Sequence, residues 1–175
     1  MDGSAKSLDL SAFSSIVTDM AENVPGMSWE PALRLVSIQL AAATKENFEG
    51  SHTPDGDPWA PLKRPRSRKR DKVKRNPGST GDKPLRDTNL LMGSVSAGDA
   101  SKEGSVRELT SHRLLFGSNV FYGLFHQEGT KTKSGAVCIP KREWLGISQS
   151  STEAIGQILE DYAVKVIVSR FPGGG

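Results

Sequence analysis

A chain of 175 residues fits one domain with a real core, although only 35% of its residues are hydrophobic, so part of it should lie outside that core. Its single cysteine, Cys138, excludes an internal disulfide and a cysteine-based zinc site. The sequence has neither a signal-peptide core nor an apolar run of membrane-spanning length, so we expect a soluble protein made in a reducing cytosol, without a membrane partner.

The net charge of +3 conceals an uneven distribution of charge along the chain. Residues 62–84 hold ten Lys or Arg and two Asp, a net +8, which leaves −5 for the rest. Such a segment favours contact with a polyanion or an acidic neighbour, or it is a solvated loop without a partner, and both interpretations stay open. It has no aromatic residues to stack on bases, which disfavours sequence-specific or single-strand readout. The cations predicted to contact DNA or an acidic partner are Lys63, Arg64, Arg66, Arg68, Lys69, Arg70, Lys72, Lys74 and Arg75.

Two helices are predicted in the amino-terminal part. Apolar residues recur at helical spacing over residues 7–22, and Pro25-Gly26 ends this segment. A second helix is predicted to begin near Ser28, with Pro31 in its first turn, and to run to about Phe48. Its apolar stripe consists of Leu33, Val36, Leu40 and Ala43, broadened by Leu35 and Ile38.

The next stretch is predicted to be mostly loop. Turn-forming residues before Trp59 indicate that this tryptophan enters the core from a loop. Residues 63–83 lack apolar periodicity and are predicted to form a flexible loop inserted in the domain. A short helical turn is expected over the apolar residues that follow, with Asp87 or Thr88 as its cap.

Strands and a last helix are predicted after that turn. Residues 98–104 read as a turn between two strands, of which the second covers residues 105–116. Residues 136–139 form a short apolar strand that ends at Pro140. A final helix, capped by Thr152, carries apolar residues at helical spacing as far as about Val166.

The stretch from Leu114 to Gly129 is expected to be the centre of the fold, because four of the eleven aromatic residues lie in it. Buried aromatic side chains contribute more to a core than most other residues. A strand leading into an aromatic turn would place them inside. We therefore predict that the structural core includes Trp59, Phe121, Tyr122 and Phe125.

The order of these elements predicts a single α+β domain over residues 1–175. Consecutive strands with short turns favour an antiparallel sheet, and helices at both ends can pack on one of its faces. The architecture is then an antiparallel sheet with two amino-terminal helices, one carboxy-terminal helix and the long basic loop as an insertion.

The sequence contains no recognisable catalytic or metal-binding constellation. The three histidines lie far apart, outside any metal-binding frame, and His126 with Glu128 would supply two ligands where zinc needs three or four from protein. Ser111-His112 has neither the context of a catalytic triad nor that of a nucleophile elbow. No phosphate-binding glycine loop occurs. We expect neither a catalytic residue nor a metal or other cofactor.

Arg142 and Trp144 follow the short strand that ends at Pro140. Arginine and tryptophan together at an exposed strand end have the composition of an interface hot spot. A core tryptophan beside a surface arginine is an equal alternative. We predict that Arg142 and Trp144, together with His126, contact a neighbouring subunit.

A series of short motifs over about residues 48–170 resembles the virion-morphogenesis or tail-completion proteins of Mu-like and related tailed phages. The motifs are Pro54-x-Gly56-x-x-Trp59-x-x-Leu62, Leu85-x-x-Thr88-x-Leu90, Phe116-Gly117-Ser118-Asn119 with Tyr122, His126-Gln127-x-Gly129, and Ile139-Pro140-x-Arg142-x-x-Leu145-Gly146. Each motif alone is weak, and their order and spacing carry the resemblance. The chain departs from the usual pattern at two places, with Asn89 where members have Gly and Gly123 where they have Ala.

The resemblance implies a structural protein of the virion neck or tail end, a tail-completion or terminator protein at the head–tail join. Such a protein would be assembled in the host cytoplasm as a homo-oligomeric ring, with a hexamer as the expected form. Its partners would be the head–tail connector, the tail tube or collar proteins, and genomic DNA held in the lumen without sequence specificity.

Two alternatives come from other classes of protein. The first is a nucleic-acid-binding accessory protein, monomeric or dimeric, that uses the basic loop to bind without sequence specificity. The second is a small enzyme whose catalytic residues are scattered along the chain. The mass of the native assembly separates a ring from the first alternative.

Overall fold

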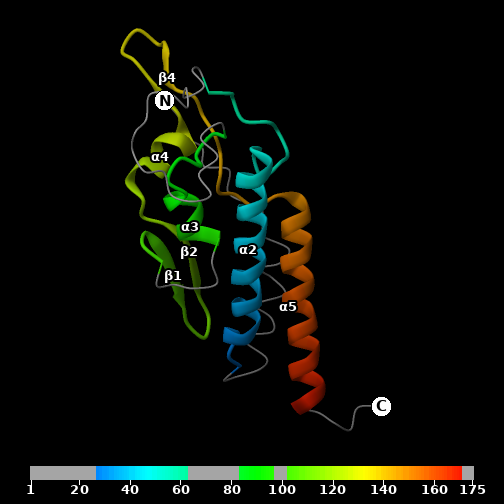
Figure 1. Cartoon of the computed structure of the whole chain (residues 1–175). Helices are drawn as coiled ribbons and strands as arrows, with labels where there is room; N and C mark the ends of the chain where they lie inside the picture. Colours follow the sequence, from blue (N-terminus) through cyan, green and yellow to red (C-terminus); the bar gives the residue numbers. More distant parts are fainter. Residues whose placement is uncertain (1–26, 63–82, 97–101, 171–175) are drawn as a thin grey trace.

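A computed structural model describes residues 27–62, 83–96 and 102–170, in the arrangement shown in Figure 1. It contains four helices and two small antiparallel sheets in these residues, which confirms the α+β class. The helix predicted over residues 7–22 lies outside the described residues. So does the basic loop apart from Lys83.

Helix α2, Glu30–Gly50, is the long amino-terminal helix predicted from the sequence. Pro31 lies in its first turn, where a missing N–H costs no helical hydrogen bond. Ser28, the predicted cap, accepts a hydrogen bond from the Glu30 N–H through Oγ at 3.3 Å, while Trp29 occupies the cap position itself. One part of the prediction is wrong: Leu35 and Ile38 do not broaden the buried stripe, because they are 53% and 56% exposed.

Helix α5, Gln149–Arg170, runs antiparallel to α2 along its length (Figure 1). A core between the two helices includes Ala32 and Val36 of α2 with Leu159 and Ala163 of α5. Tyr162 ties α5 to the start of α2, since its hydroxyl donates to the Ser28 carbonyl at 2.6 Å. The helix begins before the predicted cap Thr152: the Ser148 hydroxyl instead accepts the Ser151 N–H at 3.1 Å.

Helix α3, Leu90–Ser96, is the predicted short helix, and the Thr88 hydroxyl accepts the Leu90 N–H at 3.3 Å. Asn89 stands at φ 56°, in the left-handed region that asparagine tolerates better than most residues. Helix α3 contributes to a second core, which also receives Trp59 from its loop and so confirms the prediction for that residue. The buried members of this core are Phe48, Trp59, Leu91, Val95 and Trp144.

The strands form two separate hairpins rather than one sheet. Strands β1, Ser105–Leu109, and β2, Leu114–Ser118, pair antiparallel from Ser105 opposite Ser118 to Leu109 opposite Leu114. The single strand predicted over 105–116 is therefore wrong, because the chain turns between Thr110 and Arg113. The described element before β1 is helix α3 and not a strand, and residues 98–101 of the predicted turn lie outside the described residues.

The second hairpin pairs β3, Thr130–Lys131, with β4, Val137–Ile139. Strand β4 is the predicted apolar strand ended by Pro140, and Figure 1 shows this hairpin projecting from one end of the molecule. Its residues 131–138 are all exposed, so the hairpin contributes little to either core.

The aromatic stretch expected at the centre of the fold forms helix α4, Phe121–Glu128, and its large apolar residues face outwards. Phe121 is 77% exposed and Phe125 is 44% exposed, so both core predictions are wrong; Tyr122 is half-buried. The reason is Gly123, the buried residue of the helix: a Cβ there would lie 3.2 Å from the Trp144 ring. Because α4 packs through its glycine, Phe121 and Phe125 lie on the opposite face.

Candidate functional site

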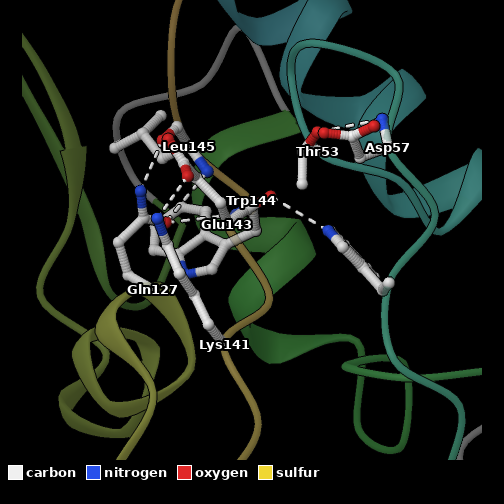
Figure 2. A network of polar contacts seen from close by, with 8 residues as sticks. Thr53, Asp57, Gln127, Lys141, Glu143, Trp144 and Leu145 are labelled. Atoms are coloured by element: carbon white, nitrogen blue, oxygen red, sulfur yellow. Dashed lines mark hydrogen bonds and ion pairs between the residues drawn. The ribbon is translucent and has the colours of Figure 1, made fainter. Parts of the chain in front are cut away.

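The segment from Ile139 to Gly146 lies at the meeting point of α2, α4 and the loop that carries Trp59. Figure 2 shows the polar contacts around it. The indole N–H of Trp59 donates to the Glu143 carbonyl at 3.0 Å, and the Asn47 side-chain amide donates to the Trp144 carbonyl at 3.3 Å. These contacts hold segment 139–146 against parts of the chain 84 and 97 residues earlier.

Gln127 fixes this segment to α4 with three hydrogen bonds. Its Oε1 accepts the backbone N–H groups of Trp144 and Leu145, each at 3.1 Å, and its Nε2 donates to the Leu145 carbonyl at 2.6 Å (Figure 2). One side-chain amide thus satisfies three backbone groups of residues 144 and 145, which lie outside the strands. We call this arrangement the Gln127 clamp.

Two glycines allow the close approach that the clamp requires. Gly123 faces Trp144, whose indole N–H donates to the Gly123 carbonyl at 2.9 Å. Gly129 ends α4 at φ 72°, and a Cβ at this position would lie 2.9 Å from the Lys141 nitrogen. A side chain at residue 129 would meet both a strained backbone and a steric clash.

Arg142 is buried within the subunit and holds the loop that leads to the basic segment. Its Nε donates to the Ala60 carbonyl at 2.9 Å and its Nη2 to the Pro61 carbonyl at 3.2 Å. On the other side of that segment, Lys83 Nζ donates to the Glu49 carbonyl at 2.8 Å. Both ends of the basic segment are therefore fastened near the carboxyl end of α2.

The prediction that Arg142 and Trp144 contact a neighbouring subunit assumed that they lie at an exposed strand end. This assumption is wrong. Arg142 and Trp144 are 5% and 4% exposed, and all their hydrogen bonds described above are to the same chain. His126, the third residue predicted to contact a neighbouring subunit, is half-buried, and its contact with a neighbour stays a prediction. The cations Lys63 to Arg75 lie outside the described residues.

His126 is placed where a positive charge is unfavourable. Partial burial, and then the positive charge of Arg142, hold the pKa of His126 below its usual range. Its backbone carbonyl accepts the Arg142 N–H at 2.7 Å, which keeps the two residues together. His126 Nδ1 is buried, with no hydrogen-bond partner in the described structure.

This environment predicts a pH dependence of stability. An unfolded chain protonates His126 near pH 6.5, whereas the folded chain protonates it at a lower pH. The unfolded state therefore binds more protons in this range, so the free energy of unfolding should be highest above pH 6.5 and fall as the pH falls through the folded-state pKa. In chemical unfolding between pH 7.5 and 5, the free energy of unfolding should decline less steeply for His126→Gln than for wild type. The control His112→Gln, at an exposed site, should give the same curve as wild type. Identical curves for wild type and His126→Gln would contradict the assignment.

The described residues offer little for catalysis. No group of three His, Cys, Asp or Glu residues gathers among them in a way that could hold a metal ion. A cavity of about 300 Å³ between α2 and the start of α5 contains His52 and Glu46. His52 Nδ1 lies 2.8 Å from the Thr53 carbonyl oxygen. Because a carbonyl only accepts, Nδ1 carries the hydrogen, and this bond fixes the ring. One histidine and one carboxylate do not make a recognisable catalytic site.

Two outward surfaces were missed by the sequence reading. One is the apolar face of α4; the other is the outer face of α5, on which acidic and apolar residues share one side. The signal for the α5 surface was available as helical periodicity, because residues spaced by three and four in 153–168 lie on one face.

Comparison with known proteins agrees with the motif series. A family model described as the phage virion morphogenesis family matches residues 8–163. No curated protein and no solved structure matched the chain. Among the described helices, none is long and apolar enough to cross a membrane. The match covers most of the sequence and includes every motif that builds the Gln127 clamp, so the chain belongs to the phage virion morphogenesis family.

Proposed function

We propose that this protein is a structural component of the neck or tail end of the virion, a tail-completion or terminator protein that assembles as a ring around the DNA path. Membership of the family gives it a role in virion morphogenesis. The observation that carries the finer proposal is the fastening of the basic segment at both ends, by Arg142 and by Lys83. Each copy then presents its cations from the same place on the body.

The charge of this segment supports a position on DNA. Residues 62–84 carry a net +8, and the rotational symmetry of a ring would repeat that charge at equal intervals. Cations directed into a lumen would hold DNA by its phosphates without reading its sequence. The adjacent partners in this proposal are the head–tail connector and the tail tube or collar proteins.

The test replaces four cations of the segment, Arg66, Arg68, Lys69 and Arg70, with serine. Native mass spectrometry should show a ring of about six subunits for both wild type and variant. DNA retention at low salt should be lost, and the plot of log affinity against log salt should become shallower by roughly 0.9 for each phosphate contact removed.

A charge-matched control replaces four exposed cations of the body, Arg34, Lys45, Lys102 and Arg113, with serine. It should keep DNA retention. If the variant with serine at residues 66, 68, 69 and 70 forms the ring and retains DNA as wild type does, the proposed role of the basic segment in holding DNA is contradicted. A wild-type protein that binds DNA as a monomer or dimer would instead favour the nucleic-acid-binding accessory protein.

A further inference from the structure

The outer face of helix α4 is an apolar surface that the described part of the chain leaves uncovered. Phe121, Leu124 and Phe125 lie on this face with exposures of 77%, 63% and 44%. The rings of Phe121 and Phe125 lie 6.5 Å apart, edge to face, so they form one continuous patch. Three large apolar side chains on an eight-residue helix are more than an isolated exposed residue and indicate a contact surface.

The exposed charges that come next along the chain are Glu128, at the end of α4, and two lysines of the hairpin. The β3–β4 hairpin follows α4 directly, and its exposed Lys131 and Lys133 carry no acidic neighbour within the hairpin. Lys141, next to the hairpin, is paired with Glu143 at 2.7 Å, which raises the pKa of Lys141. We call α4's outer face together with Lys131 and Lys133 the donor surface.

The outer face of helix α5 has the complementary composition. Its amino-terminal part carries acidic residues and its carboxy-terminal part carries two exposed valines, Val164 and Val168, at 51% and 62%. Positions spaced by three and four place all of these on one side of the helix, opposite the residues packed on α2. This acceptor surface consists of Glu153, Gln157, Glu160, Asp161, Val164 and Val168.

The two surfaces cannot meet within one subunit. Figure 1 shows α5 on one side of α2, and α4 with its hairpin on the other side. Each surface combines an apolar part with a charged part, and the charges are of opposite sign. Two different, complementary surfaces on opposite sides of one molecule fit a head-to-tail contact between copies.

We propose that the donor surface of one subunit binds the acceptor surface of the next. Phe121, Leu124 and Phe125 would cover Val164 and Val168, while Lys131 and Lys133 would lie against the acidic part of α5. This inference rests on the proposed ring and names the surfaces that close it. Apolar centres flanked by charges of opposite sign on the two surfaces give such a contact both affinity and register.

The sharpest test disables one surface at a time. Leu124→Asp damages the donor surface and Val164→Asp damages the acceptor surface; both residues are exposed, so each variant should fold as wild type does. Either variant alone should fail to form the ring, with the contact weakened roughly thirtyfold or more. An equimolar mixture should yield dimers and nothing larger, because each pair retains one intact contact.

A charge swap tests the same contact by rescue. Lys131→Glu with Lys133→Glu should weaken the ring, and so should Glu160→Lys with Asp161→Lys. The four substitutions combined in one chain should restore the ring, because the opposed charges are exchanged across the contact. Failure of the rescue, with all variants folded, would overturn the pairing of these two surfaces.

A control and the alternative occupants complete the design. Ile38→Asp introduces the same charge at a similarly exposed apolar site of α2, and this variant should still form the ring. If Ile38→Asp fails to form the ring, the assignment of the contact to α4 and α5 is overturned. A ring that persists in Leu124→Asp also overturns the inference while leaving the proposed ring intact. If particles of that variant fail to join tails, the α4 face binds another virion protein. A wild-type protein without rings would remove the proposed function itself.

Discussion

Trp144→Ala should lower the free energy of unfolding by about 3–5 kcal/mol, the usual range for truncating a buried tryptophan. Trp144 is 4% exposed and packs against Phe48 at a ring distance of 5.9 Å. Its removal leaves a cavity in the second core and an unpaired Gly123 carbonyl. For a chain of this length, the melting temperature should fall by roughly 6–20 °C.

The matched control is Phe121→Ala, which truncates an aromatic residue that is 77% exposed. In the isolated subunit it should change the free energy of unfolding by less than about 0.5 kcal/mol, as is usual for surface substitutions. Urea unfolding of the two variants side by side gives the comparison. Equal losses in both would contradict the orientation of α4 described here.

Gln127→Leu should be the second most damaging of these changes, with an expected loss of about 2–4 kcal/mol. Leucine matches the approximate size of glutamine but leaves the Trp144 and Leu145 N–H groups and the Leu145 carbonyl without their partner. Unsatisfied groups of this kind cost about 1–3 kcal/mol each when buried, and the partial exposure of this site reduces the total.

Hydrogen exchange gives a local measurement of the same effect. The amides of Trp144 and Leu145 should exchange faster in Gln127→Leu, by more than the global loss of stability accounts for. Gln149→Leu is the control, because the exposed Gln149 makes one side-chain hydrogen bond, to Glu153 at 3.0 Å. Unchanged exchange at Trp144 and Leu145 would show that Gln127 does not hold the segment.

The long helices could be predicted from the sequence because their apolar spacing is clear. Helices α2 and α5 extend close to their predicted ends. The run from Val120 to Phe125 gave no such guidance, since nearly every position is apolar and no face stands out. Gly123 was the informative residue, because a glycine among aromatic residues in a helix marks the side of close approach.

The burial of Arg142 was beyond sequence reasoning for a different reason. Arginine is rarely buried, so residue type alone places Arg142 outside. Its partners are the Ala60 and Pro61 carbonyls, 82 and 81 residues earlier in the chain, and no local pattern indicates them. The motifs were recognised as a series, but what they share, a common contact region, is a property of the folded chain.

The long reach of segment 139–146 also sets the order in which this protein can fold during synthesis. Trp59 meets its partner at Glu143, 84 residues later, which at ~5–20 residues per second takes the ribosome roughly 4–17 s. Until then Phe48 and Trp59 lack the chain that covers them. Contacts so distant in sequence also slow the folding step itself. The nascent protein therefore exposes two large aromatic side chains for seconds. During this period it is most prone to aggregation, which chaperones or a low local concentration of other nascent copies would limit.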